Sequence, residues 1–398
     1  MNSQEIKTDV VVVGAGAAGV AAAIAVAREG LGVVLLEKNS FPGGRATASA
    51  VGTICGLYLR SFKNEAKYVS DGFMKEFADK LQQRSATKPR GGTNGLYYLP
   101  YNYFDFKTVC DELLAKNGIQ PYYHSTVFNV ETNDEKVTAV EAFVYDRKLK
   151  FTANAFIDCS GEASVCFLAG ETVVEEKEYQ ASAQVFTVEN IETLLPESLG
   201  FHIARELKRA VNEDRLAPEL QWVSIVPDSF RDKSAMLKIG IPLTIDNSDN
   251  KATEVELAAR KSVNAVFDYL KNNVEAFRNA HISFVATEAG LRTGRRPMGK
   301  YTLTETDVLD CRKFDDSIAN GAWPVEFWGN DNKVKMDYFT EDDFYQIPAR
   351  CLQSANFTNL FFAGKNISAT EKAIASARVI GTCLQTGWAA GKLAGENL

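Results

Sequence analysis

The chain has 398 residues, of which 45% are hydrophobic and 24% are charged, and its formal net charge is −7. A chain of this length and composition predicts a globular protein with two domains. The acidic balance argues against nucleic acids and anionic membranes as partners, because both require a basic surface.

The cysteine spacing and the first apolar segment argue against three further classes: disulfide-rich, metal-binding and membrane-spanning proteins. None of the seven cysteines stands in C-x-x-C spacing, so we expect neither a disulfide framework nor a metal or iron–sulfur site. Free cysteines are typical of a reducing compartment, which predicts a cytoplasmic protein. The uncharged run 10–27 is interrupted by glycines and no basic segment precedes it, so we expect a strand and a packed helix rather than a membrane span.

The first elements predict a βαβ unit. Asp9–Val13 is a β-branched run that suits a central parallel strand, and Ala17–Glu29 is an alanine-rich helix. Gly32–Glu37 follows as a second strand, which completes a unit of about the usual 30 residues.

A three-stranded β-meander is expected after two helices. The helices are predicted at Ser70–Ser85 and Thr108–Asn117, and the strands at Ser125–Glu131, Val137–Tyr145 and Lys148–Ile157. Alternating strands and helices are predicted in the middle of the chain: the strands Ala181–Val188, Val223–Val226 and Met236–Pro242, and the long helix Thr253–Arg278. Near the end of the chain we expect the strand Asn359–Ala363 and the helix Ala377–Ala394.

The strongest motif is Gly14-Ala-Gly16-Ala-Ala-Gly19, which lies between the first strand and the first helix. Gly14 permits a tight turn, Gly16 lets the backbone approach a pyrophosphate, and Gly19 lets helix and strand pack closely. The phosphates would lie on the N–H groups of the helix N-terminus. Glu37, at the end of the second strand, suits the ribose hydroxyls. The motif therefore predicts a dinucleotide site, with a buried glycine turn as the alternative.

Three further segments favour FAD over NAD. Two glycines and an arginine at 43–45 let the backbone pass close to a ligand, and a second glycine turn follows a strand at Asp158–Glu162. Small residues at Gly381, Gly387 and Gly391 let the last helix pack closely and direct its N-terminus at a flavin. An ordinary surface turn and a plain C-terminal packing helix are the alternatives.

Together these segments resemble the FAD-dependent oxidoreductase family that shares its FAD fold with glutathione reductase and p-hydroxybenzoate hydroxylase. The matching pieces are Gly14–Gly19, Glu37, Gly43–Gly44, Asp158–Glu162, Ser283–Asp307 and Ile347–Gly391. The resemblance implies an α/β fold: a Rossmann-type FAD-binding domain with a parallel sheet and three-stranded meander, plus an α+β substrate domain formed by insertions. It places FAD binding in 1–54, 106–180 and 351–398, and the substrate domain in 55–105 and 181–350.

The same resemblance implies a non-covalent FAD and its contacts. Val127 is expected to touch the adenine through its backbone. The full predicted set is Gly14, Gly16, Ala17, Ala18, Gly19, Glu37, Lys38, Gly44, Arg45, Ala46, Val127, Ser160, Gly161, Gly364, Lys365, Gly381 and Thr382. Lys365 departs from the family, since many relatives have aspartate there to contact the ribitol. Several relatives also have histidine in place of Glu371.

Candidate substrate-side residues come from scattered motifs. Arg292 and Arg296 are expected to bind an anion, although they equally suit an anchor for the FAD domain. With only three histidines in the chain, the candidates for a catalytic base are Glu371, Lys372 and Tyr98. Thr304–Asp307 fits a helix capping box better than a chemical role.

For two tryptophans and one cysteine, the sequence is compatible with two alternative roles. Trp323 and Trp328 are either pocket walls or ordinary packing, and Cys55 either faces the flavin or is a small buried residue.

These observations predict an FAD-dependent oxidoreductase that transfers hydride or electrons between a small, anionic or neutral organic substrate and the flavin. A flavin monooxygenase or halogenase is the enzymatic alternative, although no W-x-W-x-I-P segment is present. A flavin-binding accessory protein without turnover, and an NAD-binding protein without flavin, are the alternatives from other classes. The sequence leaves the oligomeric state open.

Overall fold

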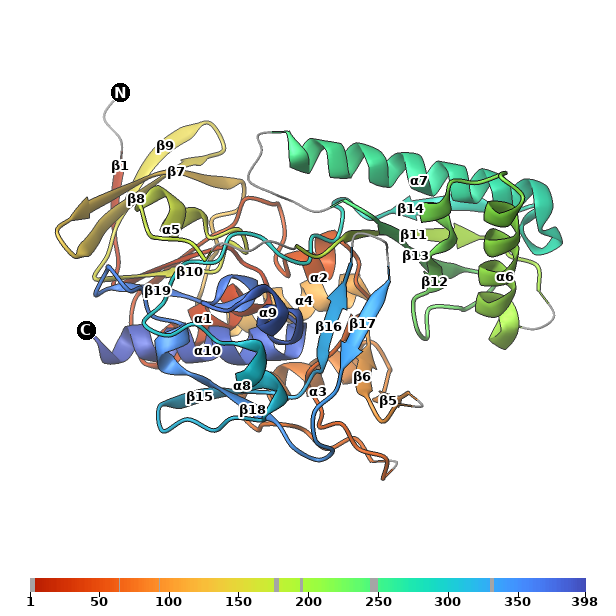
Figure 1. Ribbon diagram of the computed structural model, residues 1–398. Coiled ribbons are helices and arrows are strands. Elements are labelled where there is room, and N and C mark those ends of the chain that lie inside the picture. Colours follow the sequence, from red (N-terminus) through yellow and green to blue (C-terminus); the bar gives the residue numbers. More distant parts are fainter. Residues whose placement is uncertain are drawn as a thin grey trace.

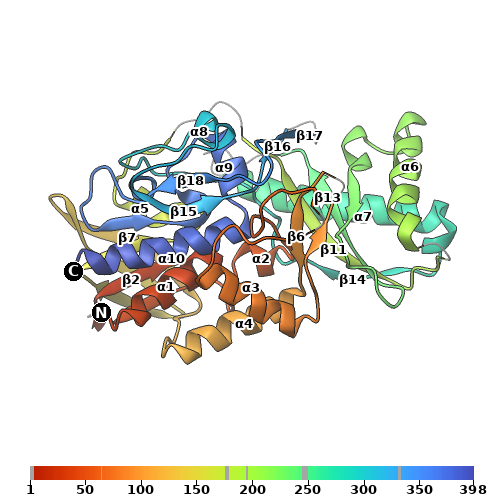
Figure 2. The ribbon, with the colours of Figure 1, turned by 90° about the horizontal axis from the view of Figure 1, so that it is seen from below.

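We describe a computed structural model of the chain, which covers residues 4–63, 65–92, 94–174, 179–193, 196–243, 250–329 and 333–398. A large body contains the parallel sheet and both chain ends, and a smaller helix-covered sheet projects from it (Figures 1 and 2). No helix among the described residues has the length and apolar character needed to span a bilayer.

The parallel sheet has the order β19-β10-β2-β3. Its strands are β2 (Val10–Val13), β3 (Val33–Leu36), β10 (Ala155–Asp158) and β19 (Leu360–Phe362), and every neighbouring pair is parallel. Because both faces of such a sheet are covered, its strands are short apolar runs, and three of the four are buried throughout. The predicted α/β class is confirmed.

The first and last long helices lie side by side under this sheet (Figure 2). They are α1 (Ala17–Arg28) and α10 (Ile380–Glu396). A Cβ at Gly387 would come within 2.0 Å of the carbonyl oxygen of Ala18, and one at Gly391 within 2.5 Å of that of Ala22. These glycines therefore let the two backbones touch, and they bring the two ends of the chain to one place.

The meander consists of β7 (Ser125–Asn133), β8 (Lys136–Val144) and β9 (Arg147–Thr152), with β1 (Gln4–Lys7) added parallel to β9. The prediction of one strand at Lys148–Ile157 was wrong, because this segment divides into β9 and β10, which belong to different sheets. Asn154 marks the break, where its N–H donates to the carbonyl of Asp9 at 3.0 Å.

Two further helices pack beside α1 and α10: α3 (Phe73–Arg84), which contacts α10, and α4 (Tyr103–Lys116), which contacts α1. Helix α4 begins five residues before Thr108, the start that the sequence predicts. The side chain of Asn102 explains this start, because it caps the helix by accepting the N–H of Phe104 at 2.8 Å.

The smaller sheet is antiparallel and has the order β12-β13-β11-β14. Its strands are β11 (Ser182–Glu189), β12 (Val223–Ile225), β13 (Ala235–Ile241) and β14 (His281–Val285). The helices α6 (Leu199–Asn212) and α7 (Lys251–Asn273) pack on it and share one hydrophobic cluster with it (Figure 1).

Short elements complete the large body. They are α2 (Arg45–Ala48), α5 (Ser164–Leu168), α8 (Glu305–Leu309), α9 (Glu371–Ala377), β4 (Thr53–Ile54), β5 (Arg90–Gly91), β6 (Tyr97–Pro100), β15 (Ser317–Gly321), β16 (Val325–Trp328), β17 (Val334–Asp337) and β18 (Tyr345–Pro348). The predicted capping box at Thr304 is confirmed: its side chain accepts the N–H of Asp307, whose carboxylate accepts the N–H of Thr304.

The hydrophobic clusters can be compared with the domain boundaries that the sequence predicts. Residues of α3, β15 and β18 share the largest cluster with α1 and α10, although the sequence assigns them to the substrate domain. The smaller sheet with α6 and α7 has its own cluster. The domain boundaries drawn from the sequence stay a prediction.

Candidate functional site

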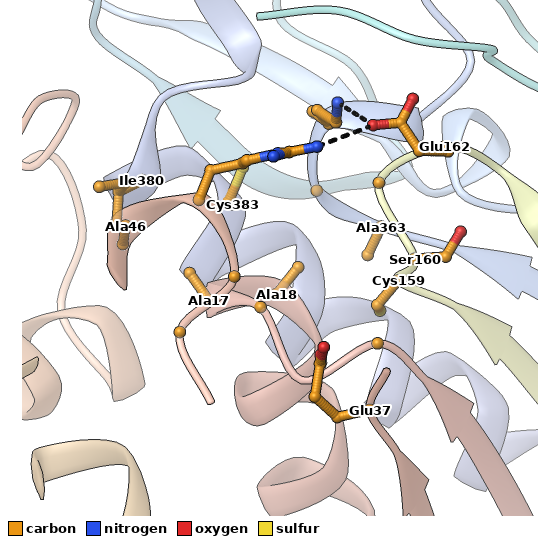
Figure 3. A pocket seen from close by; sticks show the side chains of 18 of the residues that line it. Ala17, Ala18, Glu37, Ala46, Cys159, Ser160, Glu162, Ala363, Ile380 and Cys383 are labelled. Carbon is orange, nitrogen blue, oxygen red and sulfur yellow. Dashed lines mark hydrogen bonds and ion pairs between the residues drawn. The ribbon is translucent and has the colours of Figure 1, made fainter. Parts of the chain in front are cut away.

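A cavity with an empty volume of about 770 Å³ opens between the N-termini of α1 and α10, beside the carboxyl ends of β2 and β10 (Figure 3). Its lining comes from segments far apart in sequence, including Ala17, Cys159, Ala363 and Cys383. Ligands of parallel α/β sheets bind at this edge.

The glycine turn before α1 forms the floor of this cavity. Gly14 has φ +97°, and a Cβ there would lie 2.4 Å from the carbonyl oxygen of Cys159. Gly19 is equally constrained, since its Cβ would lie 1.7 Å from the carbonyl oxygen of Gly14. At Gly16, by contrast, the nearest atom to a Cβ is 3.9 Å away, on Gly44. Gly14 and Gly19 thus serve the turn itself, whereas Gly16 leaves space open for a ligand.

The N-terminus of α1 is suited to an anion. Gly16 provides no side-chain cap, and the first turn contains no acidic residue. The first N–H groups of a helix lack partners within the helix, and they carry the positive end of its dipole. A pyrophosphate is the kind of group that satisfies both requirements.

Glu37 follows β3 at the edge of the cavity (Figure 3). Its carboxylate accepts the N–H of Ala15 at 2.6 Å and the N–H of Asn39 at 2.8 Å. Burial raises the pKa of this carboxyl, although the two hydrogen bonds oppose the shift. Each oxygen keeps a further lone pair, so the group can still accept hydrogen bonds from ribose hydroxyls.

The second glycine turn is held by a buried aspartate. The carboxylate of Asp158 accepts three hydrogen bonds: from the N–H of Ser160 at 3.0 Å, from the hydroxyl of Ser160 at 2.6 Å, and from the N–H of Cys166 at 3.0 Å. This network places Ser160 and Gly161 on the cavity wall, where the backbone lies exposed to a ligand.

A charged network crosses the upper side of the cavity. Glu162 lies 2.7 Å from the ammonium of Lys365 and 3.6 Å from the guanidinium of Arg45 (Figure 3). Arg45 also pairs with Glu288. Burial lowers the pKa of Lys365, while Glu162 opposes that shift. Lys365, which departs from the family pattern, is therefore turned toward a carboxylate of its own chain.

Replacing Glu162 by glutamine is expected to destabilise the protein near pH 7 and progressively less as the pH falls. Burial raises the pKa of Glu162, but Lys365 and Arg45 outweigh it and hold the pKa below its ordinary 4.5. A carboxyl with a depressed folded-state pKa stabilises above its unfolded pKa and loses that effect as the pH falls through the folded value. Urea unfolding of both proteins from pH 7 to below pH 4.5 measures this.

The exposed Glu112 on α4 provides the matched control, because Glu112→Gln removes only a surface pair with Arg84. A loss for Glu162→Gln that stays constant with pH would contradict this assignment of the charge network.

A second cavity adjoins the first and has an empty volume of about 1370 Å³. Its walls come from the smaller sheet and from the large body, including Tyr98, Val185 and Trp323. Within the described part of the chain, five residues line both cavities, namely Arg45, Ala46, Lys365, Arg378 and Ile380. The two spaces therefore meet at the N-terminus of α10.

Most predicted cofactor contacts gather at the first cavity. Those that line it are Gly14, Gly16, Ala17, Ala18, Glu37, Lys38, Gly44, Arg45, Ala46, Ser160, Gly161, Gly364 and Lys365. Four others lie outside its lining. Gly19 packs on Gly14, Gly381 packs on Gly56, Thr382 is fully buried, and Val127 lies on β7 beside a register shift.

The predicted catalytic residues divide between the second cavity and the protein interior. Tyr98 and Arg292 line the second cavity. Arg296 and Glu371 are not in the lining of either cavity, because they form a buried ion pair at 2.7 Å, and they are 1% and 3% exposed. Lys372 is turned outward and pairs with Glu305 at 3.0 Å. Arg296, Glu371 and Lys372 thus lie outside the lining of both cavities, and a catalytic role for them stays a prediction.

Sequence reasoning missed Lys238 and Glu326, which line the second cavity, and Glu288, which lines the first. They lie on strands and loops of the middle region, and none of them belongs to a short motif. Cys55 also lines the second cavity, but burial raises the pKa of its thiol to about 12, so it remains protonated near pH 7.

The fold and the first cavity together define a dinucleotide-binding flavoprotein. A family model described as FAD dependent oxidoreductase matches residues 9–397, and the chain belongs to this family. The cofactor is FAD, and the protein is an oxidoreductase. No curated protein sequence matches the chain.

Two solved structures share the fold at low identity. One is a geranylgeranyl bacteriochlorophyll reductase-like protein from Thermoplasma acidophilum, with 13% identity, a TM-score of 0.50, and coverage of 98% of this chain and 79% of that one. The other is a triple mutant of the flavin-dependent brominase Bmp2, with 13% identity, a TM-score of 0.50, and coverage of 98% and 80%. Among the described residues, no cluster of side chains suits a metal ion.

Proposed function

We propose that the protein transfers electrons between FAD in the first cavity and a small organic substrate in the second. The observation that carries this proposal is the wall of five residues that the two cavities share. A ligand in the second cavity would lie directly beside one that reaches the N-terminus of α10.

Bound FAD supplies the hydride chemistry at its ring. The chain's own residues would position it: the N–H groups of α1 and the space beside Gly16 for the phosphates, and Glu37 for the ribose. The N-terminus of α10 stabilises negative charge that develops nearby. We also propose a cytoplasmic location, which the free thiols of all seven cysteines support.

Tyr98 is the member of the predicted base set that lines the second cavity. Burial raises the pKa of its phenol, and Asp228 acts in the same direction. The group therefore keeps its proton near pH 7, which suits it to donate a hydrogen bond to a substrate oxygen rather than to remove a proton.

Anaerobic mixing of the FAD-loaded protein with a panel of alcohols, amines and organic acids tests the proposal. We expect at least one compound to bleach the visible flavin absorbance, while free FAD with the same compound stays oxidised. If no compound reduces the flavin and the protein instead holds a stable protein partner, the accessory-protein alternative is favoured. NAD(P)H consumption that is matched by oxygen use and raised by a compound would favour a monooxygenase.

A further inference from the structure

The second cavity contains more positive than negative charge. Among the residues that the structure describes, Lys238, Arg292 and Arg378 line it together with a single carboxylate, that of Glu326. The other cations of its wall, Arg45 and Lys365, belong to the network with Glu162 and Glu288 and are neutralised there.

The one carboxylate is already engaged. Glu326 accepts the indole N–H of Trp323 at 2.7 Å and that of Trp328 at 2.9 Å. Burial raises its pKa, but Arg378 and the indole N–H groups outweigh this and keep the pKa below its ordinary value. Glu326 is therefore ionised and fixed in place, and it offsets one cation at most.

The cations contact neutral groups instead. Arg292 donates to the carbonyl of Ala181, and Arg378 donates to the side-chain oxygen of Gln180 at 3.1 Å. Among the described residues, neither they nor Lys238 lies within ion-pair distance of a carboxylate, and the Nε of Arg378 has no hydrogen-bond partner.

This surplus of charge has an energetic cost. Burial lowers the pKa of Lys238, and the nearby Arg292 lowers it further. Burial together with Arg378 lowers the pKa of Arg292 to about 9. Glu326 opposes both shifts, but one carboxylate cannot balance three buried cations. Buried cations with too little counter-charge destabilise a protein, so a bound anion would relieve this cost.

The remaining wall suits a flat apolar body. The guanidinium carbon of Arg292 lies 4.4 Å from the centre of the Trp328 ring, and the ammonium of Lys238 lies 5.0 Å from the same centre. Val185, Ile225 and other apolar side chains line the rest of the cavity. Both cations are thus gathered at one indole inside a mainly apolar space.

We infer that the second cavity binds a small organic acid with a flat apolar body, whose carboxylate contacts Arg292 and Lys238. The inference deepens the proposed function, because it names the class of substrate that would lie beside the flavin. Arginine suits this role, since its planar fork matches the two oxygens of a carboxylate.

Calorimetric titration of the FAD-loaded protein with benzoate tests the inference without turnover. Benzamide serves as the uncharged ligand of the same shape, and acetate as the carboxylate without a ring. We expect benzoate to bind at least about tenfold more tightly than either, because charge-assisted hydrogen bonds and apolar burial then act together.

Arg292→Met is expected to weaken benzoate binding about tenfold or more, and Arg292→Lys by less. Arg295→Met is the matched control, because Arg295 lies three residues away, stacks on Phe167 and is absent from the cavity lining. Circular dichroism and FAD content check that each variant is folded, and Lys238→Met is the second variant if Arg292→Met is not.

Equal affinity for benzoate and benzamide, or undiminished benzoate binding by Arg292→Met and Lys238→Met, would overturn the inference. The two proposals fail separately. If benzoate binds in this pattern but no compound reduces the flavin, electron transfer to a substrate is refuted and the anion site stands. If an uncharged compound reduces the flavin and benzoate does not compete with it, the anion site is refuted and the function stands.

Discussion

Replacing Gly16 by alanine is expected to reduce FAD affinity about a hundredfold, which corresponds to about 2.8 kcal/mol. The nearest atom to the new methyl group is 3.9 Å away, and the residue has φ −66°, so the protein itself accommodates the change. The methyl group instead occupies space where the backbone must approach the pyrophosphate. Titration of the apo-protein with FAD, followed by flavin fluorescence, measures the loss.

The stability of the apo-protein separates this effect from simple damage. Gly16→Ala is expected to change its unfolding free energy by no more than about 1 kcal/mol, since only the N-cap position before α1 is altered. Gly14→Ala provides the contrast and is expected to destabilise the apo-protein by about 3 kcal/mol. Its φ of +97° strains any side chain, and the Cβ would lie 2.4 Å from a backbone oxygen. Normal FAD affinity in Gly16→Ala would contradict the placement of the phosphates.

Arg296→Met is expected to lower the unfolding free energy by about 3–5 kcal/mol. The substitution removes the guanidinium that lies 2.7 Å from the buried carboxylate of Glu371. It also removes the donor to the carbonyl of Ala369 at 2.7 Å. Urea unfolding followed by circular dichroism measures the change.

The double variant Arg296→Met/Glu371→Leu is expected to recover part of that loss, because neither charge then remains buried alone. Recovery stays incomplete, since the N–H of Gln180 loses its acceptor on Glu371. If Glu371→Gln kept full stability but abolished flavin reduction, a catalytic role for Glu371 would replace the structural one.

The parts of the site that follow local rules could be predicted from the sequence. The glycine motif between a strand and a helix forms the same strand–turn–helix geometry wherever it occurs. The positions of Gly14 and Gly16 in the turn, and of Glu37 at the end of the next strand, could therefore be predicted from the sequence. The same holds for Ser160 and Gly161, since a glycine turn after a parallel strand brings its backbone to the ligand edge of the sheet.

The substrate side could not be predicted in this way, because it is assembled from distant segments. Lys238 lies on β13 and Glu326 on β16, and nothing in either strand's sequence indicates that they face one space. Glu371 and Arg296 show a related difficulty: charged residues close to a recognisable motif suggest chemistry, but the ion pair between these two depends on tertiary packing. The split at Asn154 was missed because strand-forming residues stand on both sides of it, although Ala153 and Asn154 themselves are poor strand formers.

The contact of α10 with α1 has a consequence for biosynthesis. The lining of the first cavity extends from Gly14 to Cys383, so a nascent chain on the ribosome has its phosphate turn long before it has the other wall. Synthesis proceeds from the N-terminus, and early segments fold while later ones are still being made. FAD can therefore be enclosed only after translation has passed α10, and until then the alanine-lined face of α1 that α10 covers stays exposed.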